Sequence, residues 1–221
     1  MSEARRVVLV GSTGLVGRTL VARAADRRDI HLVAIARRPM PLPLGGKMTL
    51  LVEEPSAWPE AIVAEKPEAI VIALGTTRRA AGSEDAFRAV DQHLVLASAQ
   101  AAKVAGARQC IAVSSVGANA RSGNFYLRVK GELEDALTEL GFGRLDILRP
   151  GLLRGERAER RPAERLAMAA SPLLDRFLHG PARRYRSIPT ETVAAAIVGL
   201  LGETAPGRFV HEHDAIRRAA R

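Results

Sequence analysis

Short apolar runs that alternate with helix-length segments constrain this chain most strongly. Six runs are rich in Val, Ile and Leu and are continuously apolar; they cover residues 7–10, 31–35, 48–52, 69–74, 110–113 and 145–148. Continuous apolar runs of this length are typical of strands that are buried on both faces of a sheet. Between the runs lie segments of helical length, at 15–27, 57–65, 84–105 and 125–140.

This alternation predicts an α/β fold with a doubly wound parallel sheet, whose ligand binds beyond the carboxyl ends of the strands. The pattern breaks between residues 151 and 190, a segment rich in Pro and Arg that we interpret as a small substrate-side lobe or flap in the C-terminal part. After it, 191–201 is predicted to be a helix and 208–211 a last short strand. At 221 residues, the chain (1–221) is expected to form a single domain.

The chain is basic, with 33 Lys and Arg against 24 Asp and Glu, a net charge of +9. Most of this charge is expected to lie on solvated surfaces. Eleven arginines and five acidic residues fall between 144 and 186, so the 151–190 segment is a candidate for covering an anionic ligand or docking a protein partner. Because aromatic residues make up only 4% and do not interleave with the arginines, we expect no specific nucleic-acid binding.

Several features bear on location and metal binding. Apolar stretches such as 193–201 are far shorter than the ~18 to 20 residues of a membrane span, and the run at 7–10 has no signal-peptide pattern after it. These two features predict no membrane span and a cytoplasmic location. The single cysteine, Cys110, cannot form an internal disulfide, which agrees with a reducing compartment.

The histidines and Asp91 give little sign of a metal site. His211 and His213 are interpreted as neighbours on one face of the last strand, and no third ligand lies near them in sequence, so no metal is expected. Asp91 and His93, on the long helical segment, are interpreted as salt-bridged or solvated side chains.

A glycine motif follows the first predicted strand and opens the first predicted helix. Its sequence is Gly11-Ser12-Thr13-Gly14-Leu15-Val16-Gly17, the G-x-x-G-x-x-G variant of the dinucleotide-binding fingerprint. Glycines allow a tight turn and close backbone approach, and the free N–H groups at the helix N-terminus favour a pyrophosphate. The motif predicts a bound dinucleotide.

The end of the second predicted strand indicates which dinucleotide is bound. About 20 residues after Gly17, where NAD-binding folds place an acidic residue on the ribose, this chain has Arg37 and Arg38. A guanidinium binds a 2′-phosphate through paired charge-assisted hydrogen bonds. The expected cofactor is therefore NADP(H).

Polar residues follow two later strands. Leu74, Gly75, Thr76 and Thr77 follow the fourth run and supply a glycine and two hydroxyls where the pyrophosphate and ribose of the cofactor would pass. Ser114 and Ser115 follow the fifth run, and either hydroxyl is a candidate to bind a substrate oxygen.

Tyr126 and Lys130 are four residues apart on a predicted helix and so share one face of it. An ammonium beside a phenol favours the phenolate, which would let Tyr126 exchange a proton with a carbonyl or hydroxyl group near neutral pH. The predicted catalytic set is Ser115, Tyr126 and Lys130.

The order GSTGLVG, VSS and YLRVK resembles the atypical short-chain dehydrogenases/reductases. The segments LGTTRRAAGSEDAFRAVD, AVSSVGANARSGNFYLRVKGELE and ILRPGLLRGERAERRP are similar to the Tat-interacting-protein-like NADP(H)-binding oxidoreductases, over most of residues 7–214. This resemblance implies a Rossmann-type sheet, a lysine at position 130 that also bonds the nicotinamide ribose, and a Pro150-Gly151 segment that lines the nicotinamide.

These observations predict an NADP(H)-dependent oxidoreductase acting on a carbonyl or secondary alcohol. One alternative is an NADP(H)-sensing binding module with little turnover. A third possibility, an enzyme similar to nucleotide-sugar epimerases or dehydratases, shares the glycine spacing and the Tyr/Lys pair but usually has a larger C-terminal substrate lobe than the roughly 70 residues after Pro150 can form.

Overall fold

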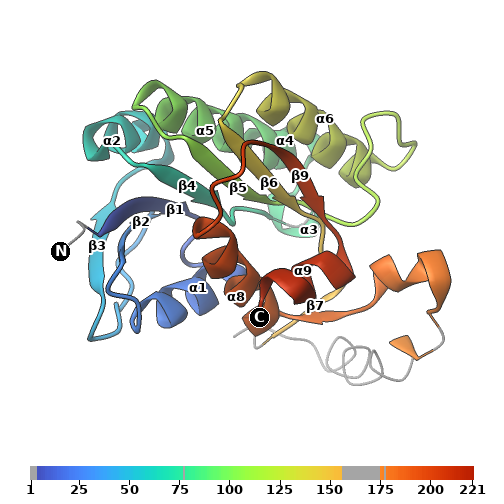
Figure 1. Cartoon of the computed structure of the whole chain (residues 1–221). Helices are drawn as coiled ribbons and strands as arrows, with labels where there is room; N and C mark the ends of the chain where they lie inside the picture. Colours follow the sequence, from blue (N-terminus) through green and yellow to red (C-terminus); the bar gives the residue numbers. More distant parts are fainter. Residues whose placement is uncertain (1–3, 77, 156–174, 177) are drawn as a thin grey trace.

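The computed structural model describes residues 4–76, 78–155, 175–176 and 178–221 (Figure 1). A sheet of seven parallel strands runs through this described part, in the order β3-β2-β1-β4-β5-β6-β9. The strands are β1 (Arg5–Val10), β2 (Ile30–Ala36), β3 (Lys47–Val52), β4 (Ala69–Ile72), β5 (Gln109–Val113), β6 (Arg144–Leu148) and β9 (Gly207–His211). The predicted doubly wound parallel sheet is confirmed.

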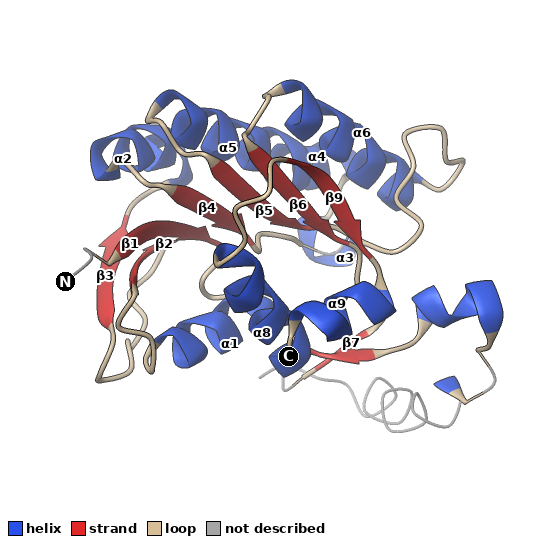
Figure 2. Cartoon of the chain, in the orientation of Figure 1, coloured by secondary structure: helices blue, strands red, loops and turns tan. Residues whose placement is uncertain are grey.

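Helices cover both faces of this sheet (Figures 1 and 2). One face carries α1 (Leu15–Ala24), α8 (Thr190–Leu201) and α9 (His213–Ala219). The opposite face carries α2 (Trp58–Glu65), α4 (Glu84–Arg88), α5 (Val95–Val104) and α6 (Phe125–Glu139). Two short elements, η1 (Pro55–Ala57) and α3 (Arg78–Ala81), precede α2 and α4.

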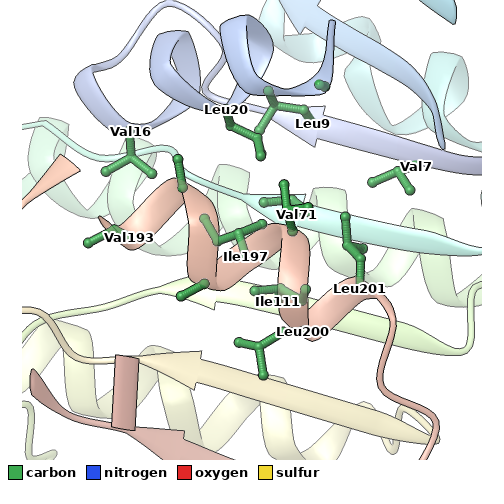
Figure 3. Close-up of a cluster of buried hydrophobic side chains, with 14 of the residues drawn as sticks. Val7, Leu9, Val16, Leu20, Val71, Ile111, Val193, Ile197, Leu200 and Leu201 are labelled. Carbon is green, nitrogen blue, oxygen red and sulfur yellow. The ribbon is translucent and has the colours of Figure 1, made fainter. Parts of the chain in front are cut away.

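Each face of the sheet has its own hydrophobic core. Because successive side chains of a strand point to opposite faces, Val7 and Leu9 of β1 pack with α1 and α8, as Figure 3 shows. Val8 and Val10 of the same strand belong to the other core, with Trp58 and side chains of α5 and α6. Burial on both faces explains why the strands are continuously apolar in sequence.

The helix predicted over 84–105 is interrupted. α4 ends at Arg88, residues Ala89–Leu94 form a π-helical turn (η2), and α5 begins at Val95. Ser83 caps α4, since its Oγ accepts a hydrogen bond from the Ala86 N–H at 3.1 Å. The π-helical turn places Asp91, which is fully buried, on the side of the helix that faces α6.

The segment 151–190 is described only in part. Leu153–Arg154 (β7) and Ile188–Pro189 (β8) form a two-stranded parallel sheet, and Gly180–Tyr185 (η3) forms a 3₁₀-helix before β8. Residues 156–174 and 177, which hold much of the predicted flap, lie outside the described residues. Two assignments stay predictions: that this segment is a substrate-side lobe, and that the chain forms a single domain.

The prediction for the last strand needs a correction. β9 ends at His211, and His213 begins α9, so the two histidines are not neighbours on one strand. The strand ends because Glu212 is the extended N-cap of α9. The His211 ring bonds Asp146 at 2.9 Å and the His213 ring bonds Asp214 at 2.8 Å.

The described residues contain neither a cluster of metal ligands nor a membrane-spanning helix. No group of three His, Cys, Asp or Glu side chains in the described ranges is placed to hold a metal ion. No helix within the same ranges is both long and apolar enough to cross a membrane.

Candidate functional site: the strand ends and helix α6

The turn between β1 and α1 requires glycine. Gly11 has φ +92°, a conformation that residues with a Cβ rarely adopt. A Cβ at Gly17 would lie 2.1 Å from the Gly11 carbonyl oxygen, so the first turn of α1 packs directly on the loop. The Gly14 N–H donates to the same carbonyl at 3.0 Å. The turn is therefore compact, and α1 begins directly after it with its free N–H groups, the arrangement that suits a pyrophosphate.

The side chains between these glycines have different environments. Ser12 is fully buried, and its hydroxyl donates to the Ile35 carbonyl at 3.1 Å, while Val16 packs into the core with α8. Leu15 is half-buried and Thr13 is exposed. Ser12 and Val16 can therefore offer a ligand only their backbone.

A cavity of about 820 Å³ opens beside this turn, at the carboxyl ends of β1, β2 and β4. This volume lies within the usual range of ligand pockets. The η2 turn and α5 form its far wall. The lining includes the predicted residues Gly11, Thr13, Gly14, Arg37, Leu74, Gly75 and Thr76, together with Trp58 and His93. Thr77 lies outside the described residues.

A second cavity of about 880 Å³ adjoins the first and shares Thr13 and Arg37 with it. Arg18 and Arg38 also line it, together with the apolar segment 39–43, and no acidic side chain is among its described lining residues. The Nε of Arg18 donates to the Thr13 carbonyl at 2.8 Å. Three arginines thus line one cavity.

Arg18 was not predicted from the sequence. The available signal was an arginine that directly follows the last glycine of the motif, on the first exposed turn of α1. Its approach to Arg37 and Arg38, about 20 residues away, depends on the pairing of β1 with β2.

The two serines after β5 differ in their contacts. The Ser114 hydroxyl is buried and donates to Glu134 Oε1 at 2.5 Å, and Glu134 is itself ion-paired with Arg149. The hydrogen bond to Glu134 raises the pKa of Arg149. Ser115 is half-buried, and its hydroxyl donates a long hydrogen bond of 3.4 Å to the Val116 carbonyl.

Helix α6 presents Tyr126 and Lys130 to the same neighbour. The Tyr126 ring packs edge-on against Phe87 of α4, with centroids 5.7 Å apart, and the Lys130 ammonium lies 2.7 Å from Asp91 of η2. Since α4 and η2 are consecutive, both side chains lie on one face of α6, as their spacing predicts. Of the two environments expected for Asp91, salt-bridged or solvated, the structure shows the salt bridge.

The loop between β5 and α6, which begins with Ser114 and Ser115, is fixed to α6 by backbone contacts. The Asn119 N–H donates to the Leu127 carbonyl at 3.0 Å, and a Cβ at Gly131 would lie 2.1 Å from the Ala120 nitrogen. The Val116 N–H donates to the Pro150 carbonyl at 3.0 Å. The structure therefore brings the segments of Ser115, Tyr126 and Pro150 to one end of the sheet.

The Pro150-Gly151 segment is itself held in place. Pro150 is buried, and a Cβ at Gly151 would lie 2.3 Å from the Arg186 carbonyl oxygen. Gly151 therefore packs directly on the backbone that leads out of η3.

Comparison with known proteins agrees with this architecture. Residues 11–204 match a family model described as NAD(P)H-binding. "Protein FMP52, mitochondrial" from Lodderomyces elongisporus is 40% identical over 163 residues, covering 69% of this chain and 68% of that protein. "Protein fmp52, mitochondrial" from Emericella nidulans is 35% identical over 212 residues, 91% of each chain. A solved structure, "Putative NAD-dependent epimerase/dehydratase from Bacillus halodurans", superposes with a TM-score of 0.70 at 22% identity, covering 98% of this chain and 99% of that one.

The expected cytoplasmic location is contradicted by these relatives, which are named as mitochondrial proteins. The expectation came from a short apolar run and a single cysteine. Neither feature separates the cytoplasm from another reducing compartment, so the inference went further than its physical basis.

The glycine turn, the adjoining cavities and the match over residues 11–204 lead to one assignment: the chain belongs to the NAD(P)H-binding family of Rossmann-like α/β proteins.

Proposed function

We propose that this protein is an NADP(H)-dependent oxidoreductase of the short-chain dehydrogenase/reductase type, acting on a carbonyl or secondary alcohol. The observation that carries the proposal is the placement of Tyr126 and Lys130 on one face of α6, with Lys130 paired to a residue of the helix that lines the 820 Å³ cavity. The motif resemblance to the Tat-interacting-protein-like oxidoreductases supports the same activity.

The residues present suit a dinucleotide with a 2′-phosphate. Gly11 and Gly14 line the 820 Å³ cavity where α1 begins, so a pyrophosphate there would accept hydrogen bonds from the N–H groups of that turn. Arg18, Arg37 and Arg38 would bind the 2′-phosphate, since guanidinium groups form strong bidentate hydrogen bonds with phosphate. Leu74, Gly75 and Thr76 would lie along the cofactor between the phosphates and the nicotinamide.

The chain's own residues would handle the substrate oxygen and its proton. The nicotinamide, when bound, supplies a hydride to the carbonyl carbon. The Ser115 hydroxyl donates a hydrogen bond to the substrate oxygen, and Ser115 suits this role better than Ser114, whose hydroxyl is bonded to Glu134. Tyr126 gives its phenolic proton to that oxygen as it gains negative charge, and Lys130 stabilises the phenolate that remains.

A substrate screen with two tyrosine variants tests the proposal. NADPH consumption is followed by absorbance across a panel of aldehydes and ketones, for the wild type, Tyr126→Phe and Tyr185→Phe. Loss of the Tyr126 hydroxyl should lower turnover of any accepted carbonyl roughly 10²-fold or more with NADPH affinity nearly unchanged, because the acid is lost and little volume changes. Tyr185→Phe is the matched control, since the chain has only two tyrosines.

If Tyr126→Phe reduces every responsive substrate as fast as the wild type, the proposed catalytic role of Tyr126 is wrong. The protein would then be better described as an NADP(H)-binding regulatory module.

A further inference from the structure

One buried carboxylate connects the loop after β4 that contains Gly75 and Thr76, here called the cofactor loop, to the proposed catalytic lysine. Asp91 is fully buried, and its Oδ1 lies 2.7 Å from the Lys130 ammonium, whose side chain is only 4% exposed. Its Oδ2 accepts a hydrogen bond from the Thr76 N–H at 2.7 Å. The two oxygens of a single side chain thus hold two different parts of the candidate site.

The pair lies directly beneath the loop that follows β4. A Cβ placed on Gly75 would lie 3.5 Å from Asp91 Oδ1 and 3.9 Å from Lys130 Nζ. Gly75 and Thr76 also line the 820 Å³ cavity, so the loop that contacts the ion pair forms part of the cavity wall.

Stability alone gives a weak reason for this arrangement. Burying two charges costs several kcal/mol per ion before pairing, and apolar residues of similar size often serve a core as well or better. Asp91 also occupies a π-helical turn, a rare local structure that is frequent at functional sites.

Two other carboxylates, both on α6 and among the residues that the structure describes, have partners of their own. Glu132 is paired with Arg88 and lies 4.0 Å from Arg128, and Glu134 is paired with Arg149. Asp91 is therefore the carboxylate placed to balance the Lys130 charge.

We propose that Asp91 is a positioning residue: it fixes the Lys130 ammonium beneath the Gly75–Thr76 loop and balances its charge toward Tyr126. This inference rests on the proposed function for the roles of Lys130 and Tyr126. It adds that the cofactor loop and the lysine are held by the same carboxylate, so the position of the lysine is coupled to the shape of the cofactor site.

The first test measures the phenol of Tyr126 without any substrate. In a Tyr185→Phe background, Tyr126 is the only tyrosine, so ultraviolet absorbance follows its ionisation alone. Asp91→Asn keeps the size of the side chain and an oxygen for the Thr76 N–H, but it leaves the ammonium unbalanced. The midpoint of tyrosinate formation should therefore fall by about half a unit or more.

Glu132→Gln is the matched control, because it makes the same chemical change on α6, two residues from Lys130, in a carboxylate paired elsewhere. Its midpoint should stay within about 0.2 unit of the parent. An unchanged or raised midpoint in folded Asp91→Asn would overturn the proposed charge balance.

The second test is a double-mutant cycle on the NADPH dissociation constant, with Asp91→Asn, Lys130→Met and the double variant. If Asp91 acts through Lys130, each single variant should weaken NADPH binding about threefold or more, and the double should bind within twofold of Lys130→Met. An equal loss from Asp91→Asn in both backgrounds would overturn the proposal, because the effect would then come from Thr76 alone.

Asp91→Asn can fail to fold, since it leaves a buried ammonium unpaired. In that case the NADPH dissociation constant of Lys130→Met is compared with that of the double variant, which lacks both charges. Values within twofold of each other support the proposal, and clearly weaker binding by the double variant would overturn it. Failure of the proposed function is recognised separately: it appears in the carbonyl screen, whereas the absorbance titration needs neither turnover nor cofactor.

Discussion

Substitution of Asp146 by Asn should destabilise the fold strongly at neutral pH. Asp146, in the middle of β6, is fully buried and accepts hydrogen bonds from Gln109 at 2.9 Å, Arg144 at 2.7 and 2.9 Å and His211 at 2.9 Å. These donors come from β5, β6 and β9, so one carboxylate joins three neighbouring strands. Burial by itself would raise the pKa of Asp146, but the hydrogen bonds from His211, Arg144 and Gln109 outweigh it and lower the pKa.

The expected magnitude follows from what the variant leaves behind. Asn keeps the shape of Asp but removes the charge, so the guanidinium of Arg144, whose side chain is 8% exposed, loses its counterion inside the sheet. Breaking a buried ion pair in this way costs roughly 3–5 kcal/mol. We expect about 3 kcal/mol, the lower end, because Arg144 also donates to the Ala205 carbonyl at 3.0 Å and stacks on Phe209 with 4.3 Å to the ring centroid.

The dependence on pH has a definite sign. Because the folded-state pKa of Asp146 is lowered, its stabilisation is present above the unfolded-state pKa of about 3.9 and is lost as the pH falls through the folded-state value. Urea unfolding of wild type and Asp146→Asn should therefore differ by about 3 kcal/mol at pH 7, with a gap that narrows below about pH 4.

Asp214→Asn is the control for the acid-unfolding measurement. A hydrogen bond from His213 lowers the pKa of this carboxyl too, but the side chain is 41% exposed. Its effect at pH 7 should stay below about 1 kcal/mol. The account of the β6 network fails if Asp146→Asn costs less than about 1 kcal/mol at pH 7, or if the gap stays constant down to pH 3.

Two further predictions concern packing. Gly131→Ala should cost about 1–3 kcal/mol in urea unfolding despite the better helix propensity of Ala, since the new Cβ would meet the Ala120 nitrogen at 2.1 Å; Gly123→Ala, with nothing within 4 Å, is the control and should be near neutral. Cys110 is fully buried, and burial raises the pKa of its thiol far above the ordinary range, so it should react with Ellman's reagent only after unfolding. Comparable losses in both glycine variants, or rapid labelling of the native protein, would contradict the described packing.

The sheet was predictable because strands buried on both faces leave an unambiguous pattern. All seven predicted strands are present, with bounds that differ by at most two residues, as for β4, predicted at 69–74 and observed at Ala69–Ile72. The glycine turn was predictable for a different reason: the requirement for glycine at Gly11 and Gly17 comes from local backbone geometry, which leaves a recognisable spacing in the sequence.

Pairings between distant segments were not predictable in this way. The Asp91–Lys130 pair joins residues 39 positions apart, and the approach of Arg18 to Arg37 needs the β1–β2 register. The π-helical turn at Ala89–Leu94 has no signal in helical spacing, because the pattern of apolar residues continues through it. The ambiguity between Ser114 and Ser115 likewise could not be reduced from sequence, since it depends on Glu134, one helix further along the chain.

The central claim is that this chain binds a dinucleotide with a 2′-phosphate at Arg18, Arg37 and Arg38. Fluorescence titration with NADPH and NADH tests it most directly, for the wild type, Arg37→Ala/Arg38→Ala, Arg18→Ala and the control Arg23→Ala near the end of α1. The wild type should bind NADPH at least about tenfold tighter than NADH, a difference of roughly 1.4 kcal/mol or more. The cavity variants should lose NADPH affinity selectively, while Arg23→Ala keeps the preference. Equal affinity of the wild type for the two cofactors, or an unchanged preference in Arg37→Ala/Arg38→Ala, would contradict the claim.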